Sequence, residues 1–432
     1  MTDSVAAFDR RVEPARIEAT VAQLRAQGWL DDDDPAVLVH DLSLLRARAE
    51  QLQQSFPAAS LHAAAIKANP AVSILSVLVE AGMGMEAASW EEVELALAAG
   101  CTPDRIVLDS PAKTRADLRR ALDRGVRLNL DNLDELDRVA ALEPGSDAHV
   151  GLRVNPAVGA GTIRSTSVAD RGSRFGVPWP QTIEPLVDCF VRHAWLDGLH
   201  VHVGSQGCSL QQLVSAVRKV LELRAAIEAR VGQGRIRWVD IGGGLPADYG
   251  RGHDLPSLDG YVAALRRETP ELFSGEFQVV TEFGRALQVG CGFAVSRVEY
   301  AGPKGERRMA TIHVGADLLP RTAYAPNDWP HELLVLDEQG RQRTGQAEPW
   351  TVLGPLCFAG DVVARDRPLP PIVEGDHLVI RDVGGYTMGM WSRHCSRGMP
   401  PVLGLTEPDE PLVVLRPRET YEDIVRFWGG RP

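Results

Sequence analysis

Eight short, mostly apolar segments alternate with helical stretches between residues 61 and 284, and this rhythm restricts the fold more than any other feature of the chain. Strands that alternate with helices pair in parallel, because each crossover needs room for a helix. Eight such units are the number that closes a (β/α)8 barrel of the TIM type. The predicted strands lie in the segments LHAAAIKA at 61, GMEAAS at 84, RIVLDS at 105, RLNLDN at 127, HVGLRVN at 149, LDGLHVHVG at 196, IRWVDIGGG at 236 and FQVVTEFG at 277.

The residues before 61 and after 284 follow other patterns. Residues near the N-terminus predict a helix from Ile17 to Leu30 and then a turn with acids at 31–34, which lacks the Gly and final Glu of a calcium loop. The segment AVLVHD predicts a strand, and Asp41 can cap the helix after it. Later strand-like segments are separated by turns rich in Pro and Gly, which is typical of an all-β, Greek-key-like domain. The predicted domains are an N-terminal extension (1–35), a linking strand and helix (36–60), the barrel (61–290) and a C-terminal β domain (291–432).

Charge and cysteine content exclude several classes of protein. Lys and Arg number 46 against 58 Asp and Glu, and the resulting net charge of −12 argues against nucleic acid or a membrane surface as a partner. The six cysteines form no CxxC pair, so neither a zinc ribbon nor a disulfide framework is indicated. The first residues lack the apolar core of a signal peptide, and no run approaches the roughly 18 apolar residues of a membrane span. We therefore expect a cytoplasmic enzyme.

Residues that end the predicted strands are candidates for function, because barrel enzymes place their chemistry at the carboxyl ends of the strands. The first strand ends at Lys67, where desolvation by the barrel walls would make the amine a nucleophile for Schiff-base chemistry. The alternative is an ordinary surface lysine. The sixth strand ends with His200 and His202, which strand alternation turns to one face. They could hold a metal, although no third ligand stands at a convincing spacing, or one could stack on a planar ligand.

Glycines and a carboxylate end the last two predicted strands. Gly242, Gly243 and Gly244 form either a tight turn or a loop whose N–H groups approach a phosphate. Glu282 could pair with a protonated ring nitrogen or, structurally, with Arg285. An amine, a stacking histidine, a phosphate loop and a carboxylate for a pyridinium nitrogen are together the parts that hold pyridoxal phosphate.

With these residues in place, the sequence resembles the fold type III pyridoxal-phosphate decarboxylases, the family that contains the diaminopimelate, ornithine and arginine decarboxylases. The resemblance extends from about residue 36 to residue 417. It is carried by AIKANP, MEAASWEEVELALAAG, GLRVNP, SRFG, HVHVGSQ, DIGGGLP, EFGR, GPLCFAGD and DVGGYTMGM. The HVGSQ and SRFG forms are closer to diaminopimelate decarboxylase than to ornithine decarboxylase.

The resemblance implies pyridoxal 5'-phosphate as the cofactor and a homodimer with shared active sites. Lys67 would carry the cofactor, His202 would stack on its ring and Glu282 would pair with the ring nitrogen. Cys357, the remaining catalytic residue, and Asp361 match residues that the family supplies from the partner subunit. The strand at 36–41 would join the C-terminal β domain. The implied cofactor-binding residues are Lys67, Glu86, Arg153, His202, Ser205, Gly242, Gly243, Gly244, Glu282, Gly284, Arg285 and Tyr386.

The substrate pocket departs from that of the diaminopimelate enzymes. Phe358 stands where they carry a Glu that helps to hold the distal amino group. Their carboxylate-gripping Arg stands in the pattern D-L-x-R-P, whereas here Pro320 precedes Arg321. A tyrosine and asparagine pattern near the end is replaced over residues 392–397. The expected substrate-binding residues are Arg321, Tyr324, Phe358 and Asp361.

We therefore expect decarboxylation of an amino acid, or of an amino-acid-derived biosynthetic intermediate, other than diaminopimelate. Phe358 favours an apolar or bulky distal group, whereas Arg321, Arg393 and Arg397 leave room for an anionic one. One alternative is an amino-acid racemase or epimerase, against which the retention of Cys357 and the ring partner argues. The other is a catalytically silent homologue that binds the cofactor, against which the intact lysine, histidine and glycine loop argue.

Overall fold

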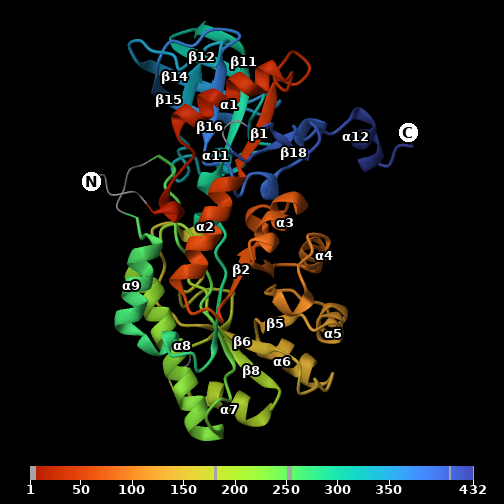
Figure 1. The fold of residues 1–432 in the computed structure, drawn as a ribbon, viewed down its shortest axis with the longest axis vertical. Coiled ribbons are helices and arrows are strands. Elements are labelled where there is room, and N and C mark those ends of the chain that lie inside the picture. Colours follow the sequence, from red (N-terminus) through yellow and green to blue (C-terminus); the bar gives the residue numbers. More distant parts are fainter. Residues whose placement is uncertain (1–5, 180–181, 251–254, 408–409, 432) are drawn as a thin grey trace. The chain divides into compact units, whose positions relative to one another are not determined.

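The computed structural model describes residues 6–179, 182–250, 255–407 and 410–431. The first five residues of the predicted N-terminal extension lie outside this part. The chain forms two compact units (Figure 1). The barrel unit comprises Met1–Asp9, Arg46–Ala247 and Asp254–Leu287, and the β unit comprises Arg10–Leu45, Asp248–His253 and Gln288–Pro432.

The barrel unit contains a closed barrel of parallel strands, which confirms the predicted fold class. The strand order is β5-β4-β3-β2-β10-β9-β8-β6, and β5 also pairs with β6. The strands end before Lys67, Gly242 and Glu282, which therefore stand in loops at the carboxyl ends. The strands are β2 (Leu61–Ala65), β3 (Gly84–Ala87), β4 (Ile106–Leu108), β5 (Arg127–Leu130), β6 (Val150–Asn155), β8 (Leu196–His200), β9 (Trp238–Asp240) and β10 (Gln278–Thr281), with β7 (Val177–Pro178) beside β6.

Helices alternate with these strands, and two of them begin at the caps that the sequence predicts. Ser209 Oγ accepts the N–H of Gln212 (3.3 Å), and Gln212 Oε1 accepts the N–H of Ser209 (3.0 Å), which confirms the predicted capping box of α8. Asp41 Oδ1 accepts the N–H of Leu44 (2.9 Å) and so caps α2 as predicted. The helices are α2 (Leu42–Ser55), α3 (Val72–Glu80), α4 (Trp90–Ala98), α5 (Arg115–Arg124), α6 (Leu133–Ala140), α7 (Glu184–Arg192), α8 (Leu210–Val231), α9 (Leu258–Glu268) and α10 (Arg285–Gln288).

Trp238 on β9 is the largest fully buried side chain of the barrel unit. It packs in one apolar cluster with Leu61, Val107 and Val280. A Cβ on Gly198 of the neighbouring strand β8 would overlap the indole ring, so glycine at this position lets the indole lie against β8.

The β unit is built on a nine-stranded mixed sheet that takes strands from both ends of the chain. β1 (Ala36–Asp41) pairs antiparallel with β11 (Gly292–Lys304) and parallel with β17 (Val402–Leu405), so it joins the β domain as the resemblance implies. The main path is β15-β14-β12-β11-β1-β17-β18, while β16 pairs with β11 and β13. The other elements are α1 (Pro14–Ala26), β12 (Arg307–Ile312), α11 (Arg321–Tyr324), β13 (Leu333–Leu336), β14 (Glu348–Leu353), β15 (Val362–Leu369), β16 (His377–Arg381), β18 (Val413–Arg416) and α12 (Tyr421–Phe427).

The first long helix differs at both ends from its prediction. It spans Pro14–Ala26 rather than Ile17–Leu30. Proline suits a first helical turn because its φ is already helical and its missing N–H is not needed there. The helix ends early because Gly28 adopts a left-handed φ of +75° and the N–H of Trp29 bonds back to the carbonyl of Leu24 (2.8 Å).

The acidic residues after this helix form a turn of their own. Asp31 Oδ1 accepts the N–H groups of Asp33 (2.9 Å) and Asp34 (2.7 Å). The guanidinium of Arg418 pairs with the Asp34 carboxylate. Local hydrogen bonds and an arginine therefore account for this cluster of carboxylates.

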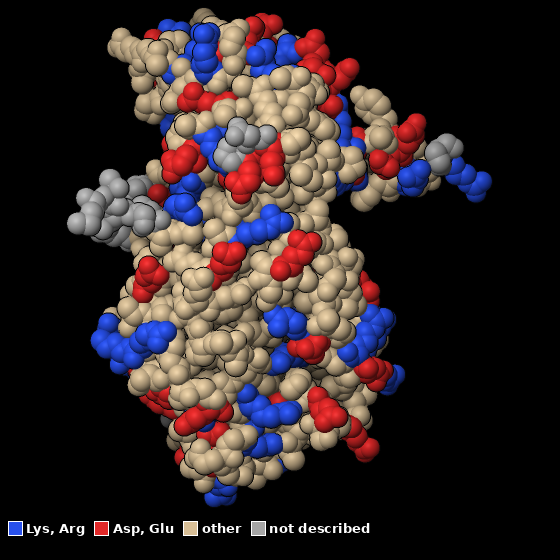
Figure 2. Space-filling model, viewed as in Figure 1, with Lys and Arg blue, Asp and Glu red and all other residues tan. Residues whose placement is uncertain are grey.

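Charged side chains of both signs are interspersed on the face drawn in Figure 2, without an extended basic patch. Within the described part of the chain, no helix is long and apolar enough to span a bilayer.

Candidate functional site

Lys67 lies directly after β2, in the 3-10 turn Ile66–Ala68, and its ammonium contacts the carboxylate of Glu86 on β3. The two strands pair with Ala65 opposite Glu86, so the parallel register brings the two side chains together. The Lys67 side chain is 43% exposed, whereas that of Glu86 is completely buried. Burial raises the pKa of Glu86 to about 8, although Lys67 opposes the shift. The amine is therefore accessible and lies beside a carboxyl group that can exchange a proton near neutral pH.

His200, the last residue of β8, lies between two carboxylates from other strands. Its Nδ1 is 3.7 Å from Asp109 Oδ1, and its Nε2 is 3.5 Å from Glu282 Oε2. All three side chains are buried. Burial alone would lower the pKa of His200, but Asp109 and Glu282 outweigh burial and raise it to about 9. Burial would likewise raise the pKa of Glu282, yet His200 holds it below its ordinary value. At neutral pH the site therefore contains an imidazolium between two carboxylates.

Asp109 and Glu282 lie beside His200 and could act as the further metal ligands that the sequence did not show for the HxH pattern. One ligand atom from each of Asp109, His200 and Glu282 lies within 4.8 Å of the others. A protonated imidazole has no free lone pair for a metal, so we interpret the cluster as an ion-pair network. Sequence reasoning missed Asp109, although it directly follows a barrel strand, which is the position that signals function.

His202 differs from His200 in its protonation state. Burial lowers the pKa of His202 to about 3, and Arg153 adds to the shift, so its imidazole is neutral. Its Nδ1 accepts the N–H of Gly243 (3.2 Å). A neutral imidazole held by a backbone hydrogen bond is suited to stacking on a planar ligand.

The glycine loop after β9 is packed tightly against the loops on either side. Gly242 and Gly244 have left-handed φ values of +66° and +113°. A Cβ on Gly242 would lie 2.6 Å from His202 Nδ1, and one on Gly243 would overlap the carbonyl of Glu282. Asp240 Oδ1 accepts the N–H of Gly242 (2.9 Å). Only glycine lets the backbone approach both neighbours this closely.

Two side-chain bridges tie together the loops that follow β8, β9 and β10. Arg285, which follows Gly284 and begins α10, donates from Nε to Ser205 Oγ (2.7 Å). Gln206 donates from Nε2 to the carbonyl of Ala247 (2.8 Å) and accepts the N–H of Ala247 at Oε1 (3.0 Å). A guanidinium, a hydroxyl and the glycine loop are thus held on adjacent loops, a donor set suited to phosphate. Gln206 was not among the predicted residues, although it stands in the HVHVGSQ motif.

Arg153 on β6 is held by carboxylates. It donates to Asp109 Oδ2 (3.0 Å) and lies 3.7 Å from Asp131 Oδ1. Its guanidinium lies 4.9 Å from the ring centroid of Phe175. Asp131 also accepts the N–H of Gly176 (3.0 Å), so this network anchors the loop that carries the SRFG motif.

The hydrogen bonding of the Glu282 carboxylate indicates whether these residues can hold pyridoxal 5'-phosphate. Its Oε1 is buried and accepts no N–H or hydroxyl group of the described residues, and the carboxylate's other close neighbour is the buried Asp240 carboxyl group, whose pKa burial and Glu282 raise. A buried carboxylate oxygen without a donor is costly, and a protonated ring nitrogen would supply that donor. Lys67 offers the amine, and Ser205 and Arg285 offer donors for a phosphate. The residues present therefore fit this cofactor.

The β unit contains the remaining predicted residues. Asp361 is buried, and its two oxygens accept the N–H groups of Ala316 and Leu356, both at 2.6 Å. These bonds shape the loop that carries Cys357 and Phe358, which are both exposed.

A second group in the β unit surrounds α11. The Arg321 guanidinium lies 4.3 Å from the ring centroid of Trp329 and 4.6 Å from that of Tyr386. Tyr386 has a left-handed φ of +58°, and Tyr324 is exposed. The structure thus divides the predicted residues. The barrel unit holds Lys67, Glu86, Arg153, His202, Ser205, Gly242, Gly243, Gly244, Glu282, Gly284 and Arg285, and the β unit holds Arg321, Tyr324, Cys357, Phe358, Asp361 and Tyr386.

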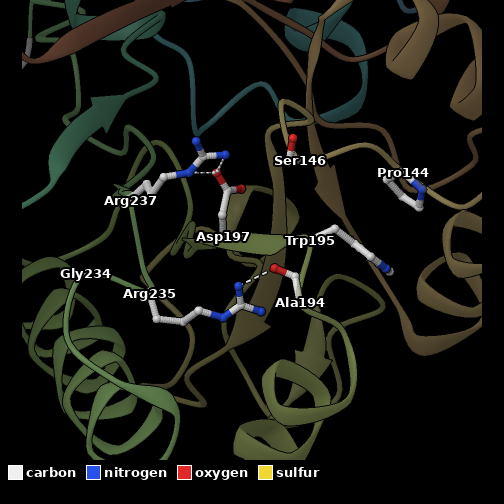
Figure 3. Close-up of a pocket in the computed structure, with 8 residues that line it drawn as sticks. All are labelled: Pro144, Ser146, Ala194, Trp195, Asp197, Gly234, Arg235 and Arg237. Carbon is white, nitrogen blue, oxygen red and sulfur yellow. Dashed lines mark hydrogen bonds and ion pairs between the residues drawn. The ribbon is translucent and has the colours of Figure 1, made fainter.

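A cavity of about 440 Å³ lies at the opposite, amino-terminal end of the barrel strands (Figure 3). Its two arginines already have partners: Arg237 pairs with Asp197 (2.7 Å), and Arg235 donates to the carbonyls of Ala194 and His193. These bonds tie the ends of β8 and α7 to the segment before β9. The two arginines therefore stabilise the fold of the barrel. The candidate functional site is the one at the carboxyl ends of the barrel strands.

The chain is similar over most of its length to known pyridoxal-dependent decarboxylases. Residues 42–289 match the family described as pyridoxal-dependent decarboxylase, pyridoxal binding domain. Diaminopimelate decarboxylase of Pseudomonas aeruginosa is 33% identical over 370 residues, which cover 83% of this chain and 84% of that relative. The enzyme of the same name from Archaeoglobus fulgidus is 30% identical over 423 residues, or 94% of this chain and 96% of that relative. The crystal structure of diaminopimelate decarboxylase from Helicobacter pylori complexed with L-lysine has a TM-score of 0.80 at 26% identity and covers 91% of this chain and 96% of that chain.

Proposed function

The chain belongs to the pyridoxal-dependent decarboxylases, and we propose that it removes the α-carboxyl group of an amino acid other than diaminopimelate. Members of this family are carboxy-lyases that use pyridoxal 5'-phosphate, which accepts the electron pair left at Cα when carbon dioxide departs. The proposal that the substrate differs from diaminopimelate depends on one observation, the presence of Phe358.

Different residues of the barrel would bind the cofactor and transfer protons. Lys67 would hold the cofactor through its amine, and Glu86 beside it would take up or supply a proton. His202 would lie against the ring. Glu282, kept ionised by His200, would accept a hydrogen bond from the ring nitrogen. After carbon dioxide has departed, Cys357 returns a proton to Cα.

Phe358 argues against diaminopimelate, because a phenyl ring cannot bind an ammonium group as a carboxylate does. The ring is 48% exposed in the single chain and lines an apolar pocket of the β unit. An ammonium buried there without a partner would cost on the order of several kcal/mol. The curated relatives are named diaminopimelate decarboxylase, so they support the shared chemistry, and the proposed change of substrate depends on Phe358.

The proposed assembly is a homodimer in which each site takes Cys357 from the partner subunit. A two-fold interface uses the same patch twice, so each dimer would contain two composite sites.

The decisive experiment measures carbon dioxide release from a panel of L- and D-amino acids that includes meso-diaminopimelate, with Lys67→Ala as the inactive control. We expect release from at least one amino acid and poor turnover of diaminopimelate. Turnover of diaminopimelate as fast as that of the best substrate would overturn the altered pocket. Inversion at Cα without carbon dioxide release would replace the decarboxylase with a racemase.

A further inference from the structure

A pocket in the β unit lies beside the loop that carries Cys357. Its volume is about 310 Å³, which is in the range of small-ligand sites. Alanine, proline, leucine and aromatic side chains line it, and its polar lining residues are Ser392 and His394 besides the hydroxyl of Tyr324. No Lys, Arg, Asp or Glu is among the described residues that line it.

The aromatic wall of this pocket is held in place. A Cβ on Gly360 would overlap the Phe358 ring, so the ring lies directly over this glycine. The N–H of Asp361 bonds to the carbonyl of Phe358 (3.0 Å), which closes the turn between them. The Phe358 ring meets His394 edge to face, with centroids 6.2 Å apart. These contacts hold the Phe358 ring at the pocket as an apolar wall.

The arginines that could have received an anionic substrate are engaged elsewhere in the β unit. Arg393 pairs with Glu419 and lies 3.9 Å from the ring centroid of Phe427. Arg397 lies 3.6 Å from the Asp317 carboxylate and donates to a backbone carbonyl. Arg321, the third candidate, packs against the rings of Trp329 and Tyr386, and none of the three arginines lines the pocket. The anionic alternative that the sequence left open therefore finds no cation here.

We propose that this pocket receives the distal end of the amino-acid substrate and that this end is an uncharged, apolar group of about the size of an aromatic ring. The inference depends on the proposed function, because Cys357, which precedes Phe358 in the chain, is there assigned to the reacting carbon. A charged distal group would lose its hydration without gaining a partner, whereas an apolar group gains by burial against the ring.

The test compares amino acids of similar size on the holoenzyme: phenylalanine and leucine against lysine and glutamate. We expect kcat/KM for carbon dioxide release to be at least about tenfold higher for the apolar pair. Phe358→Glu should reverse the order between leucine and lysine, while the matched control Phe358→Leu should keep it. Calorimetry with isoamylamine and cadaverine, the product amines of leucine and lysine, should show the same reversal in Kd without any turnover. Because the Phe358 side chain is half exposed, both variants should unfold at the wild-type temperature.

The outcomes separate this inference from the proposed function. Carbon dioxide release that favours lysine or glutamate, unchanged by Phe358→Glu, would overturn the apolar pocket and leave the decarboxylase in place. No release from any amino acid in the wider panel would overturn the proposed function itself.

Discussion

His200 and Glu282 form a buried ion pair at the carboxyl end of the barrel, with Nε2 3.5 Å from Oε2. Asp109 lies 3.7 Å from the other ring nitrogen. The ionisation of Glu282, which is proposed to pair with the cofactor, thus depends on His200. His200 has no contact with the cofactor in the proposed arrangement.

The first prediction concerns pH. The pKa of His200 is raised from 6.5 to about 9 in the folded chain. Its ion pairs therefore stabilise the fold fully below pH 6.5, and this stabilisation is lost as the pH rises through 9. We expect the difference in unfolding free energy between the wild type and His200→Asn, from urea denaturation, to shrink by on the order of 3 kcal/mol over this range.

A difference that stays constant with pH would show that His200 is not protonated in the fold. If the variant does not fold, an NMR titration of the His200 ring in the wild-type protein answers the same question.

The second prediction concerns the cofactor. Purified protein should be yellow, and borohydride should fix the cofactor onto Lys67, as read by peptide mapping. Lys67→Ala should take up no covalent label. Lys304→Ala, which changes an exposed lysine at the end of β11, is the matched control and should label normally. Label on another lysine, or a wild-type protein that binds no pyridoxal phosphate, would contradict the assignment.

The third prediction concerns the shared site. Lys67→Ala should be inactive because the cofactor has no covalent anchor, and Cys357→Ala should be severely slowed because Cα lacks its proton donor. When the two variants exchange subunits, one site of each heterodimer receives both lesions and the other receives neither. Mixing should therefore restore activity without any wild-type chain.

If Cys357 acts within its own chain, every site keeps one lesion and mixing restores nothing. That result, with subunit exchange confirmed by mass spectrometry, would refute the composite site.

The fourth prediction concerns packing in the barrel. Gly198→Ala would drive a methyl group into the buried Trp238 ring and should destabilise the fold by about 1–3 kcal/mol. Gly145→Ala is the matched control, because a Cβ there meets nothing within 4 Å and the φ is not left-handed. Equal unfolding midpoints for the two variants, measured by thermal denaturation, would show that the indole moves aside at no cost.

Local sequence signals were enough for the positions of strands and caps. The alternation of apolar segments predicted each barrel strand, and Ser209 and Asp41 predicted their helix caps. The end of α1 was wrong by several residues, because the left-handed Gly28 and the hydrogen bond from Trp29 to Leu24 stop the helix before the apolar pattern ends.

The sequence by itself determined which residues stand at the ends of the strands. Lys67, Gly242 and Glu282 occupy such positions whatever lies beside them, because a strand and its end are properties of a short segment. Only the tertiary structure decided which charges are neighbours. Asp109, His200 and Glu282 come from three strands that meet when the barrel closes, and Glu419 and Asp317 neutralise Arg393 and Arg397 across the β unit. Charge pairing depends on the register of elements distant in the chain, and no local pattern of residues contains that register.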